Sequence, residues 1–500
     1  MKMTTFPFPL RRSLAVALAA AALLGGCGGL LQTPYEPPAV QVPPNWRQGG
    51  PANAGRPADP APAPGPVAAM PPAAAGATAG AAATSTSAPS DDAPFGAWWR
   101  RFGDTDLDRL VDAALARNND LAAAAVRVRR AQLVAGLAQD DLYPLFGGRV
   151  GVDRSRALYG DRAISRSNSA ELTVSYELDL WGRLSRARDA AQWEADATEQ
   201  DRQSAALTLT GTASTLYWQT GFINQRIASS LESIGYAERT LALVRAQYAA
   251  GGASALEVAE AEQNLANQQA AHTDLLQQRV QYANALAILF DGPPGQAAAD
   301  PRRLPQGPLP EVRAGLPADL LGRRPDLRAA ELRLREALAN VDATRAAYYP
   351  PITLTGSLGS VSAALGELLR NPVAALGAGL NMPFLQVNRA RLDIALSRTD
   401  FEERVVSFRQ ALYQALADVE DALSARTQLA DRGALLQRSL DAARRAERLY
   451  EVRYRAGAVS LRFWLDAQEQ RRNAEVALDQ NRLDRLVNQA QLYQSLGGGA

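Results

Sequence analysis

The sequence YAAGGAS at residues 248–254 returns as YRAGAVS at residues 454–460. The same offset of 206 residues relates Tyr143 to Tyr349 and Arg183 to Arg389. This register holds without a gap from about residue 107 to 292 and from 313 to 498. Agreement at one constant offset over so many positions indicates that the chain contains two copies of one structural unit.

Long helices are predicted on both sides of each turn. From Arg183 to about Ala250 the residues are mostly Ala, Leu, Arg, Gln and Glu, which favour a helical backbone. With one kink allowed, roughly 65 residues at about 1.5 Å each predict a rod ~100 Å long. A second helix returns from the turn to about Phe290, and the second copy repeats this pattern. Helices of this length outside a large globule pack as coiled coils, so each copy is predicted to end in a long helical hairpin.

Glycine and serine mark the turns between the paired helices. Gly251 and Gly252 precede Ser254, whose hydroxyl is placed to cap the returning helix. Gly457 and Ser460 are predicted to do the same in the second copy.

Short strand patterns lie inside the helical sequence. Apolar Phe146, Val150 and Val152 alternate with polar Arg149 and Asp153, and a period of two is typical of strands. We expect a polar loop at roughly 157–169 and strands at about 145–156, 170–180, 351–360 and 374–386, the last including Met382. Each segment has roughly ten residues, which is the length that crosses a bilayer as a tilted strand.

Four strands in one chain cannot close a barrel, because known outer-membrane barrels have at least about eight strands. After the N-terminal signal no apolar stretch approaches about 18 residues, so no transmembrane helix is expected. Strands that cross a membrane must satisfy every backbone group, which requires a closed barrel. Several chains must therefore contribute strands, and three chains would supply twelve. The predicted fold class is mainly α with membrane β strands, whose polar faces line a water-filled conduit.

The N-terminus is predicted to be a lipoprotein signal peptide at residues 1–26. Lys2, Arg11 and Arg12 precede an apolar stretch that is too short to span a membrane. This stretch ends in LGGC, which resembles the bacterial lipobox and would make Cys27 the site of a covalent diacylglycerol and fatty acid. An aspartate after the cysteine would resemble an inner-membrane retention signal, and Gly28 in that place favours the outer membrane.

A linker separates the lipid anchor from the folded body. Residues 51–90 contain 9 Pro, 16 Ala and 4 Gly. Such a composition cannot bury enough surface to offset the entropy of ordering the chain. The predicted organisation after the signal is a lipidated segment 27–50, a disordered linker 51–93, a first repeat 94–292, an inter-repeat linker 293–312 and a second repeat 313–498.

Composition argues against most metal and cysteine enzymes and against nucleic-acid binding. One cysteine and one histidine, His272, exclude a disulfide within the chain, a cysteine metal cluster and a multi-histidine site. The net charge of +1 lacks the basic excess of nucleic-acid binders. His272 is interpreted as an ordinary helix-surface residue. No catalytic constellation is present, so we expect neither an enzyme nor a cofactor beyond the covalent lipid.

Three motifs carry a resemblance to a known family: WWRRFGD at 98–104, SYELDLWGR at 175–183 and GLPADLLGRRPDL at 315–327. With the duplication, the chain over 94–498 resembles the TolC-like outer-membrane efflux proteins, specifically the NodT-type lipoprotein branch. The resemblance implies a homotrimer in the outer membrane of a Gram-negative bacterium, with a twelve-stranded β-barrel on a periplasmic α-barrel. It also implies the exit duct of a tripartite efflux pump for small drug-like molecules. A periplasmic adaptor and an inner-membrane transporter of the resistance-nodulation-division class would be its partners.

The resemblance also assigns roles to residues around the two turns. Asp466 matches the family's constriction acid, which in three copies would form a ring that favours cations. Tyr454 matches a residue that holds the closed state, and Glu257 is its candidate partner. Arg462 lies one turn before Asp466 and could pair with it at i, i+4, which would dilute the acidic ring. The turns would dock the adaptor through Tyr248, Gly251, Gly252, Ser254, Gly457 and Ser460.

Alternatives remain open on the sequence. The duct could serve type I protein secretion or metal-ion efflux, although only Met70 and Met382 follow the signal, which disfavours soft-metal export. A lipid-anchored coiled-coil scaffold without a pore would explain the helices and Cys27 but not the four strand patterns.

Overall fold

The computed structural model describes residues 32–47, 96–156, 158–159, 164–295, 299–312, 314–315, 317–367, 370 and 372–498. Cys27, the signal peptide and the linker at 51–93 lie outside these residues. The chain divides into two compact units. Unit 1 falls within residues 1–41, 122–204 and 325–413, and unit 2 within 42–121, 205–324 and 414–500.

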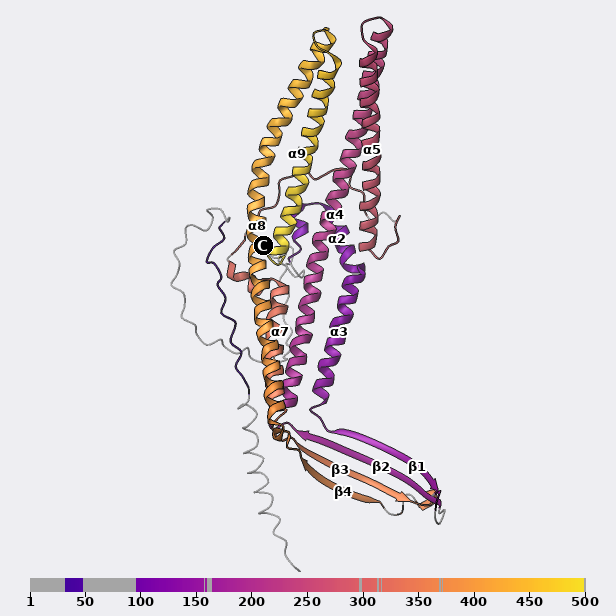
Figure 1. Cartoon of the computed structure of the whole chain (residues 1–500), viewed down its shortest axis with the longest axis vertical. Helices are drawn as coiled ribbons and strands as arrows, with labels where there is room; N and C mark the ends of the chain where they lie inside the picture. Colours follow the sequence, from indigo (N-terminus) through magenta and orange to yellow (C-terminus); the bar gives the residue numbers. More distant parts are fainter. Residues whose placement is uncertain are drawn as a thin grey trace, which may run out of the picture. The chain divides into compact units, whose positions relative to one another are not determined.

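Unit 1 contains the sheet, in which the two repeats meet strand to strand. It consists of antiparallel strands in the order β1 (Leu145–Arg156), β2 (Ile164–Leu178), β3 (Ile352–Ser362) and β4 (Val373–Leu380) (Figure 1). Tyr176 of β2 lies opposite Leu354 of β3, so the central pairing joins the first repeat to the second. Within this described sheet, β1 and β4 each have one edge without a partner strand.

Large apolar side chains of the sheet are exposed. The exposed fraction is 78% for Phe146, 79% for Val150 and 94% for Leu376. Successive side chains of a strand point to opposite faces, so the period-two pattern of β1 places Phe146 and Val150 on one face. A contiguous apolar surface of this kind marks contact with something other than water.

Two strand boundaries differ from those expected. β2 begins at Ile164, because the polar residues 164–169 pair with the end of β1, as Ser169 does with Gly151. The loop before it is correspondingly shorter than 157–169. β4 ends at Leu380, so Met382 lies outside the strand. Pro383 follows, and because proline has no N–H donor for a strand ladder the chain turns there into the short helix η5 (Pro383–Leu385).

The motif at 175–183 joins the sheet to helix α4 (Arg183–Ala249). The Asp179 carboxylate accepts hydrogen bonds from the backbone N–H groups of Leu184 and Ser185 at 2.9 and 2.8 Å. It thereby satisfies donors that the first turn of a helix leaves free. The Trp181 Nε1 donates to the Pro350 carbonyl at 2.8 Å, which ties the start of α4 to the segment before β3.

Helices and an extended N-terminal segment complete unit 1. The helices are most of α3 (Asn119–Asp140), α7 (Pro325–Ala346) and the first parts of α4 and α8 (Val387–Arg455). Residues 32–41, called the strap below, pack along them. Thr33 donates from its backbone N and its Oγ1 to the buried Asp342 carboxylate at 2.8 and 2.7 Å. The Arg335 guanidinium lies between the rings of Tyr35 and Trp193, at 5.0 and 5.3 Å.

Unit 2 is built from the rest of α4 and α8 with α2 (Thr105–Arg117), α5 (Ala255–Leu289) and α9 (Leu461–Ser495). Its main core combines aliphatic side chains with aromatic ones, among them Trp98, Trp99, Trp218 and Tyr493. The Trp98 and Tyr493 rings stack with centroids 5.2 Å apart, which fixes the start of the first repeat against the end of the second. The shorter helices of the described chain are η2 (Trp98–Phe102), η3 (Pro317–Asp319), α6 (Leu320–Arg323) and η4 (Leu365–Glu367).

None of the helices in the described ranges combines the length and the apolar character that a membrane span requires.

Candidate functional site

The two turns have the same backbone geometry. Gly251 and Gly457 have φ angles of +75° and +73°, a region that glycine adopts without strain. In the first turn the Gly252 N–H donates to the Gln247 carbonyl, and in the second the Ala458 N–H donates to the Arg453 carbonyl, both at 2.8 Å. This arrangement ends α4 and α8 with a left-handed glycine that satisfies their last carbonyls. The glycines at these positions are therefore needed by the turn itself.

The capping of the returning helices differs between the copies. The Ser254 hydroxyl accepts from the Glu257 N–H at 3.3 Å, and the Glu257 carboxylate accepts from the Ser254 N–H at 2.8 Å. This reciprocal pair is a capping box. Ser460 also occupies the position before its helix, but its side chain makes no capping hydrogen bond, so that part of the prediction is wrong. Phe463 stands where a glutamate would complete the second box, so no carboxylate returns to the serine backbone.

Tyr454 connects the two hairpins within unit 2. Its hydroxyl donates to the Gln247 Oε1 at 2.7 Å, which joins α8 to α4. Its ring stacks on Trp464 of α9 at 5.3 Å, and Trp464 in turn contacts Tyr236 of α4 edge to face at 6.1 Å. Tyr454 is buried, and burial raises the pKa of its hydroxyl, with a smaller contribution from the negative charge of Glu257. The hydroxyl therefore stays protonated and can donate.

The expected pairing of Tyr454 with Glu257 is not formed. The Glu257 carboxylate is engaged by the Ser254 backbone. The Tyr454 hydroxyl instead donates its hydrogen bond to the neutral side-chain amide of Gln247. Sequence reasoning missed Gln247. A signal was present, because Gln247 corresponds at the repeat offset to Arg453, so the turn motif is preceded by different side chains in the two copies.

Asp466 and Arg462 lie together on the first turns of α9. The Arg462 Nε is 3.9 Å from the Asp466 Oδ2, and the two side chains are 75% and 57% exposed. The predicted i, i+4 ion pair is therefore present, with a long separation between its charged atoms. An exposed ion pair of this kind is worth no more than about 1 kcal/mol, so both charges remain available to solvent and to passing ions. Tyr248, at the end of α4, is also exposed.

His272 is not an isolated surface residue. Its Nδ1 lies 2.7 Å from the Ser230 Oγ, so the side chain makes a polar contact between α5 and α4 and is half-buried. Over the described residues no group of three or more histidine, cysteine, aspartate or glutamate side chains is arranged to hold a metal ion.

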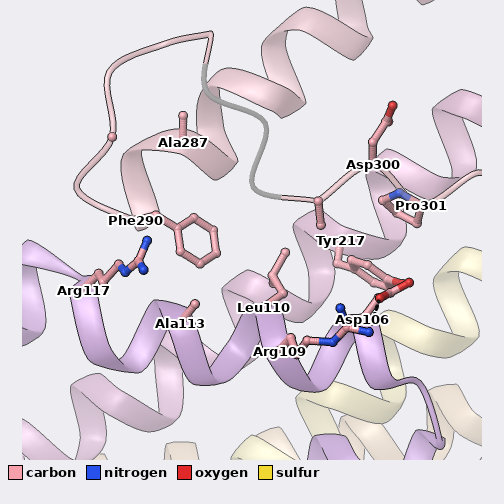
Figure 2. A pocket seen from close by; sticks show the side chains of 12 residues that line it. Asp106, Arg109, Leu110, Ala113, Arg117, Tyr217, Ala287, Phe290, Asp300 and Pro301 are labelled. Carbon is pink, nitrogen blue, oxygen red and sulfur yellow. Dashed lines mark ion pairs between the residues drawn. The ribbon is translucent and has the colours of Figure 1, made fainter.

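A pocket of about 500 Å³ lies beside α2 in unit 2 (Figure 2). Its wall combines apolar Leu110 and Phe290 with the ion pair of Asp106 and Arg109, whose closest atoms are 3.2 Å apart. The two charged side chains are 66% and 78% exposed, so the pocket opens to solvent. Neither histidine nor cysteine is among the residues that line it, and it presents no pair of nucleophile and base.

Comparison with known proteins identifies the family. The model of the outer membrane efflux protein family matches residues 110–290 and 316–498, which fall in the two repeats. The chain therefore belongs to the outer membrane efflux protein family, whose role is transport. It is an outer-membrane exit duct with the TolC-like fold, and this membership disfavours the scaffold without a pore.

Curated relatives match over most of their length. The pyoverdine export outer membrane protein OpmQ of Pseudomonas putida is 35% identical over 425 residues, which are 83% of this chain and 90% of that protein. The probable efflux pump outer membrane protein TtgC of the same species is 30% identical over 507 residues, covering 98% and 96%.

Solved structures show the same fold. The outer-membrane channel OprN superimposes with a TM-score of 0.75 at 27% identity, covering 80% of this chain and 92% of that one. The open state of the MtrE outer membrane channel of Neisseria gonorrhoeae gives a TM-score of 0.71 at 27% identity, with 94% and 98% covered.

Proposed function

We propose that three copies of this chain form one duct, with a twelve-stranded β-barrel and a helical barrel. The observation that supports this most directly is the open sheet, in which β1 and β4 each keep a free edge while apolar side chains lie exposed. A free edge presents unpaired N–H and C=O groups, which in lipid must be satisfied by another strand. Pairing β4 of one copy with β1 of the next closes the ring without any further element.

Exposed apolar residues on α3 and α8 in unit 1 support the same assembly. On α3, Val126, Leu133 and Leu137 are 67%, 63% and 67% exposed, at spacings of seven and four residues. On α8, Leu392 and Leu396 are 69% and 62% exposed. Spacings of this kind place apolar side chains on one helix face and form the seam between packed helices. Contacts between copies would cover these apolar side chains.

The duct serves as the outer-membrane part of a tripartite pump for small drug-like molecules. A periplasmic adaptor docks on the turns at 248–254 and 454–460, and an inner-membrane transporter of the resistance-nodulation-division class supplies the cargo. Relatives described as pump components, such as TtgC, support this assignment. A β-carbon at Gly251 or Gly457 would meet no atom within 4 Å, which leaves these turns accessible to a partner.

The substitution Gly252→Phe tests adaptor docking. Gly252 does not have a positive φ, and a β-carbon there makes only an ordinary contact with the Gln247 carbonyl at 3.6 Å. The fold should therefore accept the larger side chain, whereas a docked adaptor should not. In cells that depend on this duct, we expect intracellular accumulation of ethidium to rise to the level of a strain without the duct.

Gly366→Phe, in the β3–β4 loop, is the matched control, because a β-carbon there also meets no atom within 4 Å. Normal efflux by the Gly252→Phe protein, at normal levels in the outer membrane, would contradict docking at this turn. Loss of a secreted protein with intact ethidium efflux would favour the type I secretion alternative.

The N-terminal anchor is also part of the proposal, with Cys27 carrying a diacylglycerol and a fatty acid. The LGGC sequence supports it. Cys27→Ser should abolish incorporation of labelled palmitate, and label in that variant would refute the assignment.

A further inference from the structure

A groove of unit 1 has a charge distribution that duct formation alone does not require. Its volume is about 580 Å³, and it lies between α3, α4 and α7. Small alanines, among them Ala187 and Ala190 of α4, leave the space open, and Val134 of α3 adds an apolar side chain that is 50% exposed. Charged and polar side chains surround this apolar patch. The size is within the range of about 300–1,000 Å³ typical of sites for small molecules.

The groove and the strap lie on different faces of α7. The strap contacts Arg335 and Asp342, whereas Arg333, Glu336 and Asn340 line the groove. At about 100° per residue, the two strap contacts lie within about 20° of one another, and the groove residues lie about 100–160° away from Arg335. Under the proposed function the strap leads back to a lipid on Cys27, so it runs along the outside of the duct. The groove then faces the interior.

The acidic side chains of the groove lie on α4 and α7, and all of them are engaged by partners on α7. Arg333 forms an ion pair with Asp201, and its Nε lies 3.2 Å from a Glu194 carboxylate oxygen. Glu336 accepts a hydrogen bond from Asn340 at 2.9 Å. Burial, followed by the negative charge of Glu194, raises the pKa of Glu336.

Two arginines on the α3 wall of the groove differ from Arg333 in having no carboxylate partner among the described residues. Arg127 and Arg130 of α3 line the groove and are exposed, and neither has an ion pair or hydrogen bond to any residue that the structure describes. The three carboxylates of the groove lie on α4 and α7 together with Arg333, whereas the described residues of the α3 wall carry two guanidinium groups and no carboxylate, so positive charge is concentrated on that wall. Guanidinium groups bind carboxylates through paired, charge-assisted hydrogen bonds.

We infer that this groove is a cargo-contact site inside the duct for small organic acids that combine a carboxylate with a flat apolar body. Arg127 and Arg130 bind the carboxylate, and the alanines with Val134 contact the apolar part. This inference rests on the proposed function, because the groove faces cargo only if the chain forms a duct.

Calorimetry on the detergent-purified full-length trimer tests binding, with 2-naphthoate as the acid and 2-naphthamide as its neutral analogue. Replacing both arginines (Arg127→Gln with Arg130→Gln) should weaken naphthoate binding about tenfold or more, as expected for loss of a charge-assisted pair. Arg129→Gln is the matched control, since it removes the same charge from the same helix outside the groove. Equal affinity in the double variant, or equal binding of acid and amide, would overturn the inference.

Recordings of the current through single trimers in planar bilayers distinguish a failure of this inference from a failure of the proposed function. The protein without ligand should conduct, and naphthoate should reduce its current in proportion to occupancy. A protein that binds naphthoate but does not conduct would refute the duct. A conducting trimer whose current is unaffected by bound naphthoate would place the groove outside the conduction path and refute the inference. If the double variant does not assemble, Arg127→Gln alone, with trimers verified by light scattering, makes the same comparison.

Discussion

Asp466 and Arg462 act against each other at the start of α9. Both side chains are more than half exposed, and their nearest charged atoms are 3.9 Å apart. In a ring of three copies, each aspartate raises the local cation concentration and each arginine lowers it. In the proposed trimer, the net selectivity of this site would therefore depend on a small difference between two weakly coupled charges.

Asp466→Ala should weaken cation selectivity, and Arg462→Ala should strengthen it, each by about twofold to fivefold for an exposed pair. Reversal potentials in a potassium chloride gradient across planar bilayers measure the change. Unchanged selectivity in both variants would remove these residues from the filter.

The contact between Tyr454 and Gln247 is neutral, and the Trp464 ring packs beside it. Tyr454→Phe keeps the ring stack but leaves the Gln247 oxygen without its donor. A hydrogen bond of this type contributes about 1 kcal/mol, so the closed state should lose about fivefold in population relative to the open state. Single-channel recordings should show a higher open probability.

Tyr450→Phe is the control, because Tyr450 lies on the same helix and its ring stacks on Phe463. An open probability in Tyr454→Phe equal to that of this control would show that the hydrogen bond does not hold the closed state.

At the scale of single elements, the two turns are alike in backbone and unlike in capping. Ser254 and Glu257 satisfy each other's backbone donors, whereas the Ser460 side chain has no such role. Ser254→Ala should therefore destabilise the first turn of α5 by about 1 kcal/mol, and Ser460→Ala should change α9 much less. Amide hydrogen exchange at the two helix starts measures both effects. Equal acceleration in both variants would contradict the difference in capping.

Local sequence was sufficient for the elements whose conformation is set by neighbouring residues. The turns could be predicted because a glycine in the left-handed region ends a helix wherever it occurs, as at Gly251 and Gly457. The beginning of β2 could not be predicted, because residues 164–169 are mostly polar and only their pairing with β1 makes them a strand. Gln247 was missed for a similar reason, since its partner Tyr454 lies 207 residues away.

For the whole molecule, the open sheet edges predict that several copies close one barrel. An unpaired edge in lipid leaves backbone groups unsatisfied, and with four strands in the described sheet the proposed barrel of twelve strands needs three copies. Light scattering on the detergent-purified protein should give the mass of a trimer, and negative-stain images should show rings in end views. A monomer, or rods without rings, would mean that the strands do not close.

The duplication made the equivalent turns of the two repeats predictable while hiding the differences between them. The common register places both turns at equivalent positions, whereas the pairing of β2 with β3 is seen only in the structure. Within that frame, Gln247 corresponds to Arg453 and Glu257 to Phe463, so polar contacts made by one copy are absent from the other.

The single capping box gives the two hairpins unequal resistance to strain. A pull applied equally to both should unwind the α9 start before the α5 start, since only the latter has its serine and glutamate joined. Opening would then proceed in two stages, and a recording would show a brief intermediate current level before full conductance. Completing the second box with Phe463→Glu should shorten or abolish that level.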